Sequence, residues 1–70
     1  MWKYAGELRV GDVWTERTDG GDTRSYRVIA IARDLAPVII RVTGSCVTTG
    51  QLHTMDFFPV NRVEVREKGT

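Results

Sequence analysis

Short runs of alternating apolar and polar residues, separated by clusters of turn-forming residues, most limit what this chain can fold into. The clearest run is RVEVR at 62–66, which puts Val63 and Val65 on one side and its charged residues on the other. An antiparallel strand with one buried face has this pattern. No window of about a dozen residues keeps the i, i+3, i+4, i+7 apolar spacing of a helix without interruption by Gly, Pro or β-branched residues. The chain is therefore expected to be all-β.

Two earlier segments also favour strands. Residues 12–18, DVWTERT, are rich in β-forming residues and end at the turn cluster DGGD. In residues 24–33, strict alternation puts Tyr26 and Val28 on one face and Ile29 and Ile31 on the other. Apolar residues on both faces are typical of a central or strongly bent strand, which is covered on two sides.

The middle of the chain predicts a further strand and a hairpin. In residues 37–43, PVIIRVT, alternation directs Val38, Ile40 and Val42 inward and Arg41 to solvent, with Pro37 limiting hydrogen bonding at the start. Residues 44–58 are expected to fold back around Thr49-Gly50. The apolar residues of the return segment break strict alternation, which indicates a bulge; they are Leu52, Met55 and Phe57.

Five short strands with little room for helix predict one small closed or nearly closed barrel. Closure hides strand edges and lets few residues enclose a core. A chain of 70 residues supports one domain, expected over 1–67, with a polar tail at 68–70 that frays. With 41% hydrophobic and 27% charged residues the chain is globular rather than disordered.

Two terminal segments resemble SH3 domains. FFPVNRVEV at 57–65 is similar to the end of that fold, where an apolar residue and Pro lead into a single 3-10 turn before the last strand. ELRVGDV at 7–13 resembles an acidic-Leu-to-Gly-Asp segment of the same fold, and MWKY lies near its first strand. The resemblance implies a five-stranded SH3-like barrel with a short 3-10 turn before the last strand. In it Phe58 would plug the barrel, Pro59 would preset the turn, and Asn61 would bond nearby backbone.

The resemblance does not extend to the peptide groove of signalling SH3 domains. The paired tryptophans of that groove are absent, SYRV stands near their place, and Arg62 stands where an aromatic residue is expected. Recognition of a polyproline helix needs aromatic ridges, so that function is not expected here. Only Tyr4, Pro59 and Asn61 match groove positions of the family.

The aromatic residues are the best indication of a binding surface. Trp or Tyr exposed beside Arg forms a stacking and bidentate surface suited to a protein partner or to single-stranded nucleic acid. The alternative is that Trp14 and Tyr26 cap the core with their polar edges in water. The predicted binding residues are Tyr4, Trp14, Tyr26, Arg41, Pro59, Asn61 and Arg62.

Charge favours a protein partner. The 10 basic residues, eight of them Arg, nearly balance 9 acidic residues, giving a net charge of +1. No strong basic field is available to drive non-specific nucleic-acid binding. We therefore expect a non-catalytic interaction module, an adaptor, inhibitor or assembly subunit of bacterial or phage origin. A nucleic-acid-binding barrel is the alternative, and assembly into a homo-oligomer would help so small a chain bury surface.

Catalytic and metal-binding groups are sparse. Cys46 and His53 are the only thiol and imidazole, and they could form a nucleophile–base pair oriented by Asp56 if the chain folds back near Gly50. Packing for the thiol and a surface position for the imidazole are the expected roles. DGGDT at 19–23 lacks the ligand spacing of a calcium loop. No enzyme activity, cofactor or metal is expected, and the lack of a long apolar run or signal sequence favours a cytoplasmic protein without a membrane span.

Overall fold

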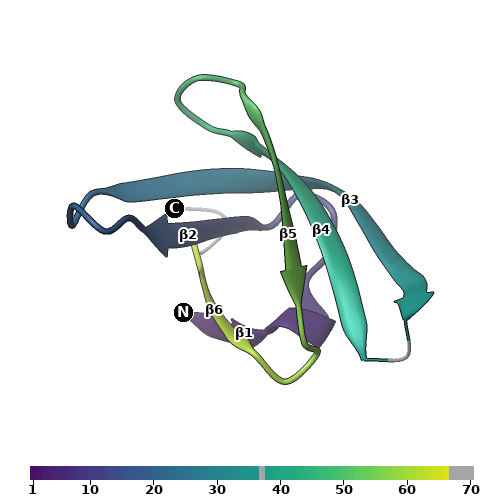
Figure 1. The fold of residues 1–70 in the computed structure, drawn as a ribbon. Coiled ribbons are helices and arrows are strands. Elements are labelled where there is room, and N and C mark those ends of the chain that lie inside the picture. The colour runs from purple at the N-terminus through teal and green to yellow at the C-terminus, as the bar shows by residue number, and fades with distance from the viewer. Residues whose placement is uncertain (37, 67–70) are drawn as a thin grey trace.

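The computed structural model is built almost entirely of strands (Figure 1). It describes residues 1–36 and 38–66, with the side chains of 34–36 left out; the predictions for Pro37 and for the tail at 68–70 lie outside this part. The elements in chain order are β1 (Trp2–Tyr4), the 3-10 helix η1 (Ala5–Glu7), β2 (Val13–Arg17), β3 (Thr23–Ala36), β4 (Ile39–Cys46), β5 (Leu52–Phe57) and β6 (Arg62–Val65).

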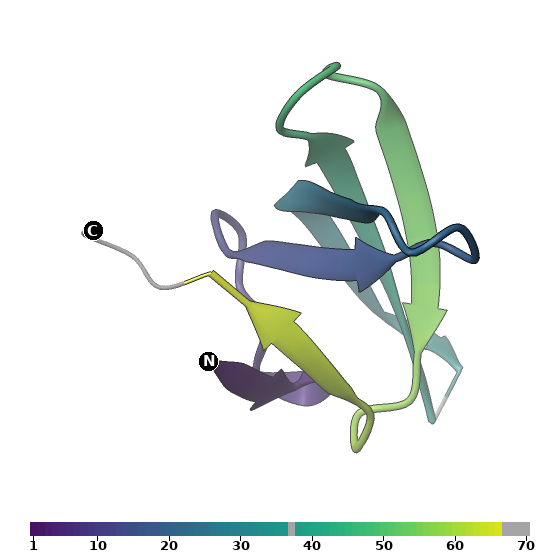
Figure 2. The same ribbon diagram turned by 90° about the vertical axis from the view of Figure 1, so that its left-hand side faces the viewer.

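The six strands form a single antiparallel sheet in the order β1-β6-β2-β3-β4-β5. The sheet curls so that β5 comes to face β2 and β6 across the interior (Figure 2). The two outer strands, β1 and β5, do not pair with each other, so the described part of the sheet is open. The all-β prediction is confirmed, whereas the described sheet has six strands instead of the predicted five and is not a closed barrel. The added strand is β1, whose three residues are too short to show alternation.

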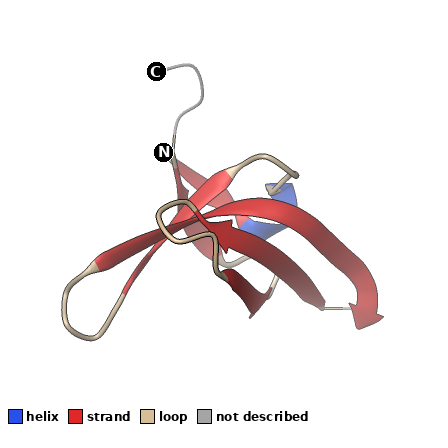
Figure 3. Ribbon diagram, turned by 90° about the horizontal axis from the view of Figure 1, so that it is seen from above, coloured by secondary structure: helices blue, strands red, loops and turns tan. Residues whose placement is uncertain are grey.

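The long strand β3 joins the two halves of the sheet. Residues Thr23–Arg27 pair with β2, and the region from Tyr26 to Ala36 pairs with β4. Seen from above, the strands of the sheet curve and cross one another and do not lie flat (Figure 3). A bulge between Val28 and Ala30 inserts Ile29 as an extra residue, because Val28 faces Gly44 while Ala30 faces Thr43. Such a bulge bends the strand and reverses the alternation beyond it.

The bulge decides which isoleucine is buried. Ile31 packs against the core together with Val28, whereas Ile29 is 46% exposed. The predicted grouping of Ile29 with Ile31 on one face is therefore wrong. The prediction of a strongly bent strand agrees with the observed register shift.

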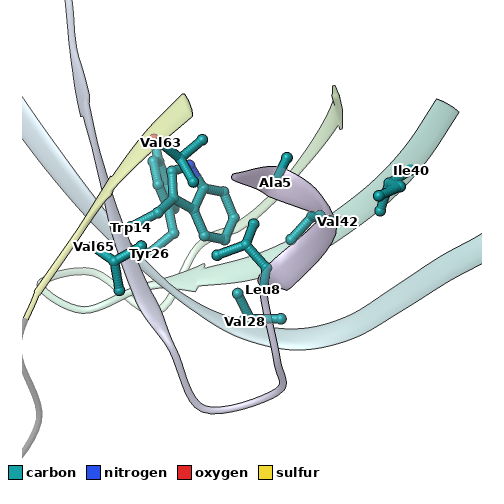
Figure 4. Packing of buried hydrophobic residues seen from close by; sticks show 9 residues of the cluster. All are labelled: Ala5, Leu8, Trp14, Tyr26, Val28, Ile40, Val42, Val63 and Val65. Carbon is teal, nitrogen blue, oxygen red and sulfur yellow. The ribbon is translucent and has the colours of Figure 1, made fainter. Parts of the chain in front are cut away.

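The core gathers around Trp14, the largest fully buried side chain (Figure 4). Its ring lies 5.2 Å from that of Tyr26 and 6.3 Å from that of Phe57, the latter edge-on. Burying this ring contributes more than any other single side chain, because stabilisation scales with the apolar area removed from water. The other members of the buried cluster are Ala5, Leu8, Val28, Ile40, Val42, Val63 and Val65.

The last strand matches its prediction, and the preceding strand does so in part. Val63 and Val65 are buried between exposed charged residues. In β4, Ile40 and Val42 are buried and Arg41 points to solvent, but Val38 precedes the strand and is 55% exposed.

The segment before β6 folds differently from its prediction. Phe57 points inward because it pairs with the buried Ile40, while Phe58 lies beyond the end of β5 and is 53% exposed. The expectation that Phe58 plugs the core is therefore wrong, and Phe57 takes that role. The chain turns where the Asn61 amide donates to the Phe58 carbonyl, at 3.0 Å. This is a β-turn, and the described 3-10 helix is η1, after the first strand.

Candidate interaction surface

The pairing of the first strand with the last places Tyr4 beside Arg62. These residues are directly opposite in the β1–β6 register, and the guanidinium carbon of Arg62 lies 5.7 Å from the centre of the Tyr4 ring. A guanidinium at this distance is attracted by the face of the ring. Tyr4 remains 48% exposed, so the ring and the cation are both available to a partner.

Trp2 extends this surface along β1. It faces Glu64 in the register and is 62% exposed, which is unusual for the largest aromatic side chain. Alternation along a strand puts Trp2 and Tyr4 on the same side of the sheet. We call Trp2, Tyr4 and Arg62 the aromatic surface.

The turn that precedes β6 is hydrogen-bonded to η1, the segment that directly follows Tyr4. The amides of Ala5 and Gly6 donate to the carbonyls of Asn61 and Pro59, at 2.7 and 3.0 Å. The Asn61 side-chain oxygen accepts from the Phe58 amide at 2.8 Å, which confirms the predicted backbone bond of Asn61. A Cβ on Gly6 would lie 3.3 Å from the Pro59 carbonyl oxygen, so a larger residue there would press against the turn.

Four of the seven predicted binding residues therefore lie on adjoining segments. Tyr4 and Arg62 belong to the aromatic surface, while Pro59 and Asn61 form the turn that holds η1 next to it. Their neighbourhood follows from the β1–β6 pairing, which brings the two ends of the chain together.

A shallow groove of about 310 Å³ joins the aromatic surface to β5. It opens where β6 and β2 separate, beyond the last described bridge between them at Trp14–Val65 and Thr15–Glu64. We call it the seam groove; its lining includes Trp2, Arg17, Met55, Phe57, Arg62 and Glu64.

The other three predicted binding residues lie elsewhere. Trp14 is completely buried, and its indole N–H donates to a Glu16 carboxylate oxygen at 3.0 Å, so it cannot offer its ring to a partner. Tyr26 is only 6% exposed. Both rings therefore belong to the core, as in the alternative, but the indole N–H of Trp14 is bound by Glu16 instead of water.

Arg41 lies on the β4–β5 hairpin. Its guanidinium donates to both carboxylate oxygens of Asp56, at 2.8 and 3.1 Å. These hydrogen bonds, together with the charge of Arg41, lower the pKa of the Asp56 carboxyl below its ordinary value. Arg41 is thus already paired within the protein.

A second cavity, of about 570 Å³, contains both Cys46 and His53. The His53 ring stacks on Tyr26 at 4.6 Å, and its Nε2 lies 3.4 Å from a Glu16 carboxylate oxygen. Hydrogen bonds from the Thr49 side chain and from the backbone of Thr49 and Thr48 lower the pKa of the Cys46 thiol.

These contacts differ from the predicted nucleophile–base arrangement. Asp56 is bound to Arg41, so the carboxylate beside His53 is Glu16. Among the described residues, no hydrogen bond joins Cys46 to His53. In the same part of the chain, no group of three or more His, Cys, Asp and Glu side chains is placed to hold a metal ion. No described helix has the length and apolar character needed to cross a bilayer.

The predicted binding residues do not include Trp2, Met55 or Phe58, which are all exposed. Trp2 carries no local signal, because its exposure depends on β1 being an outer strand of the sheet. Phe58, which adjoins Phe57 in the sequence, was predicted to be buried. Only the register of β5 shows which of the two rings points inward. No protein-family model, curated protein or solved structure matches this chain.

Proposed function

We propose that this protein is a non-catalytic interaction module that binds a protein partner through the aromatic surface and the seam groove. The observation that carries this proposal is an exposed tryptophan beside a tyrosine–arginine pair at the rim of a partly apolar groove. Trp, Tyr and Arg are the residues most enriched among those that dominate binding energy at protein interfaces. The exposed apolar surface of this tryptophan is unfavourable in water, and a partner that covers it would gain binding free energy.

The distribution of arginines supports a protein partner over nucleic acid. A continuous basic face, free of acidic groups, is what phosphate binding requires. Arg41 is neutralised by Asp56, and Arg33 donates to the carbonyls of Gly6 and Leu8. Arg62 sits next to Glu64 in the seam groove. Basic and acidic groups are thus mixed over the described surface.

The likeness to SH3 domains forms part of the proposal. The three positions that match groove residues of that family, Tyr4, Pro59 and Asn61, lie on adjoining segments of this fold. An SH3-like origin would place the binding surface at the same end of the sheet. The exposed Trp2 supplies an aromatic ring there, although it comes from a different position in the chain.

The proposal is tested by capturing a partner from cells that produce the protein, purifying it, and measuring its affinity for matched variants. Trp2→Ala is expected to weaken binding about 30-fold, the effect of losing roughly 2 kcal/mol at a dominant interface residue. Val10→Ala is the control, because Val10 is equally exposed but lies outside the seam groove. Equal binding by wild type and Trp2→Ala would contradict the proposed surface.

Nucleic acid is tested in parallel with single-stranded homopolymers over a range of salt concentrations. An affinity for these that falls by several decades between low and moderate salt would assign the protein to nucleic-acid binding instead.

A further inference from the structure

Within residues 1–36 and 38–66, no strand lies against the outer edge of β5. In this part of the chain β5 pairs only with β4, through an uninterrupted register from Leu52 opposite Ser45 to Phe57 opposite Ile40. It is a regular six-residue strand at the end of the sheet, without the bulge, proline or lysine that commonly protects such an edge.

The register shows which backbone groups face outward. The Cys46 amide donates to the Gln51 carbonyl at 2.9 Å, so this pair is hydrogen-bonded across the hairpin. In an antiparallel ladder hydrogen-bonded pairs alternate with non-bonded pairs. The N–H and C=O groups of Leu52, Thr54 and Asp56 therefore point away from β4. Within the described chain no hydrogen-bond partner is found for these three amides.

The opposite edge of the sheet is protected. β1 is only three residues long, and its outward amide at Tyr4 donates to a Glu7 carboxylate oxygen at 3.2 Å. The basic side chain of Lys3 also sits on this strand, where it pairs with Asp12 at 3.4 Å. Short length, a blocked amide and a lysine all oppose the addition of another strand.

The seam groove lies next to the open edge. Met55 and Phe57 of β5 line it from one side, and Trp2 and Arg62 line it from the other. A strand laid beside β5 would direct every second side chain toward this groove, because side chains alternate between the two faces. The groove would receive apolar side chains from such a strand.

We propose that the partner contributes an extended segment, which adds to β5 as a seventh strand and places alternate apolar side chains in the seam groove. This inference rests on the proposed protein-binding function and names its mode. The outward N–H and C=O groups of Leu52, Thr54 and Asp56 occur at every second residue. The backbone of an extended peptide has donors and acceptors at the same spacing and can therefore pair with them.

Charge indicates the composition of the segment and argues against a second copy of this chain. Two arginines, Arg17 and Arg62, line the groove together with Glu64 and Glu16, and neither arginine forms an ion pair with a described carboxylate. Because the Glu16 carboxylate is already bound by the Trp14 indole and lies beside His53, the two arginines outnumber the one remaining carboxylate. The segment is therefore expected to carry an acidic residue. β5 itself offers only Asp56, which is bound to Arg41, so another copy of β5 would bring no free carboxylate to these arginines.

Selection from a displayed library of random peptides of about twelve residues tests the inference on the intact protein. The selected peptides are expected to alternate apolar and polar residues and to include Asp or Glu. The decisive variant is Thr54→Pro, which removes an outward amide but no backbone bond to β4, and proline is tolerated at such edge positions. It also removes the exposed hydroxyl contact of Thr54 with Thr43 of β4, at 3.4 Å, and the matched Thr54→Val variant removes the same contact. We expect it to fold and to lose peptide affinity at least about 10-fold. Thr54→Val, which keeps the backbone amide, is expected to bind like wild type.

Backbone chemistry on the peptide gives a second measurement that does not depend on the folding of a variant. N-methylation at alternate residues of a selected peptide should abolish binding in one register and have little effect in the other. Bound peptide should also slow hydrogen exchange at the amides of Leu52, Thr54 and Asp56.

Three results with peptides or with the free protein would overturn the inference. These are failure to select any peptide, unchanged affinity of selected peptides for Thr54→Pro, and self-association of the free protein that Thr54→Pro abolishes, which would assign the edge to a second copy. A purified partner that binds Thr54→Pro normally but loses affinity for Trp2→Ala would remove strand addition and leave the proposed function intact. A purified partner that binds both Thr54→Pro and Trp2→Ala with wild-type affinity would overturn both strand addition and the proposed binding surface.

Discussion

The two tryptophans of this protein have opposite environments. Trp14 lies in β2, which is paired on both sides, and none of its surface is exposed. Trp2 lies in β1, which among the described strands is paired on one side only, and most of its surface is exposed. The same residue type thus serves stability in the middle of the sheet and stays exposed at its edge, where we propose that it contacts a partner. Position in the sheet, rather than residue type, divides the aromatic residues between core and surface.

The largest expected effect comes from removing the inner tryptophan. Trp14→Ala should lower the free energy of unfolding by about 3–5 kcal/mol, because it leaves a large cavity and removes the indole hydrogen bond to Glu16. Trp2→Ala should change it by less than about 0.5 kcal/mol. Urea denaturation of both variants checks the comparison, with Trp14→Phe as a milder substitution should Trp14→Ala fail to fold. Similar losses for the two positions would show that Trp2 is also part of the core.

Gly44 probes how closely the inner ring is packed. A Cβ at this position would lie 2.6 Å from Cζ3 of Trp14 and 2.9 Å from Cβ of Tyr26, so the rings must move to admit it. Gly44→Ala is expected to cost about 1–3 kcal/mol through overpacking, in spite of the usual preference for Ala over Gly in a strand. Gly20→Ala is the control, because a Cβ there meets nothing closer than the Thr18 hydroxyl at 4.0 Å. A stable Gly44→Ala variant with an unchanged near-UV spectrum would contradict this packing.

The adjacent phenylalanines repeat the comparison within two residues. Phe57→Ala should lower the free energy of unfolding by about 2 kcal/mol, because the partly buried ring packs edge-on against Trp14. Phe58→Ala should cost less than about 0.5 kcal/mol. Thermal melting of the pair is a sensitive measurement, because a small domain shifts by several degrees for each kcal/mol. A larger loss at Phe58 would restore the plug predicted from sequence.

The smallest expected effect concerns the exposed Arg41–Asp56 pair. Its hydrogen bonds lower the pKa of Asp56 in the folded protein. The pair therefore stabilises the fold above the carboxyl's unfolded pKa, and this contribution disappears as the pH falls through its lower folded pKa. Asp56→Asn should remove that part of the acid-dependent loss of stability, and Arg41→Gln should do the same. A pH titration of urea midpoints that is identical for wild type and both variants would show that the pair is screened by solvent.

The local alternation of the chain was sufficient to predict some elements. Val63 and Val65 were placed correctly because β6 is regular and has one buried face. Asn61 was also placed correctly, since its hydrogen bond lies within the turn that contains it. Tyr4 and Arg62 were both named, but their contact depends on the pairing of strands far apart in the chain.

The remaining features depend on register, which alternation alone does not specify. One inserted residue in β3 exchanges Ile29 for Ile31 in the core, and no local composition marks the bulge. Phe57 and Phe58 are equivalent until the pairing of β5 with β4 is known. The open edge could not be predicted either, because barrel closure is a property of the whole sheet.

The pairing of β1 with β6 has a consequence for the order of folding during synthesis. β1 has no described strand partner other than β6, and the amides of Ala5 and Gly6 are satisfied only by the turn that precedes it. Because the ribosome releases the chain from its N-terminus, Trp2 and Tyr4 emerge before the rest of the domain. Their strand can form only after almost all of the domain has been synthesised, since its partner β6 lies at 62–65. The residues proposed for recognition are therefore among the last to be assembled, and a nascent chain should not bind its partner before residues 62–65 have left the exit tunnel.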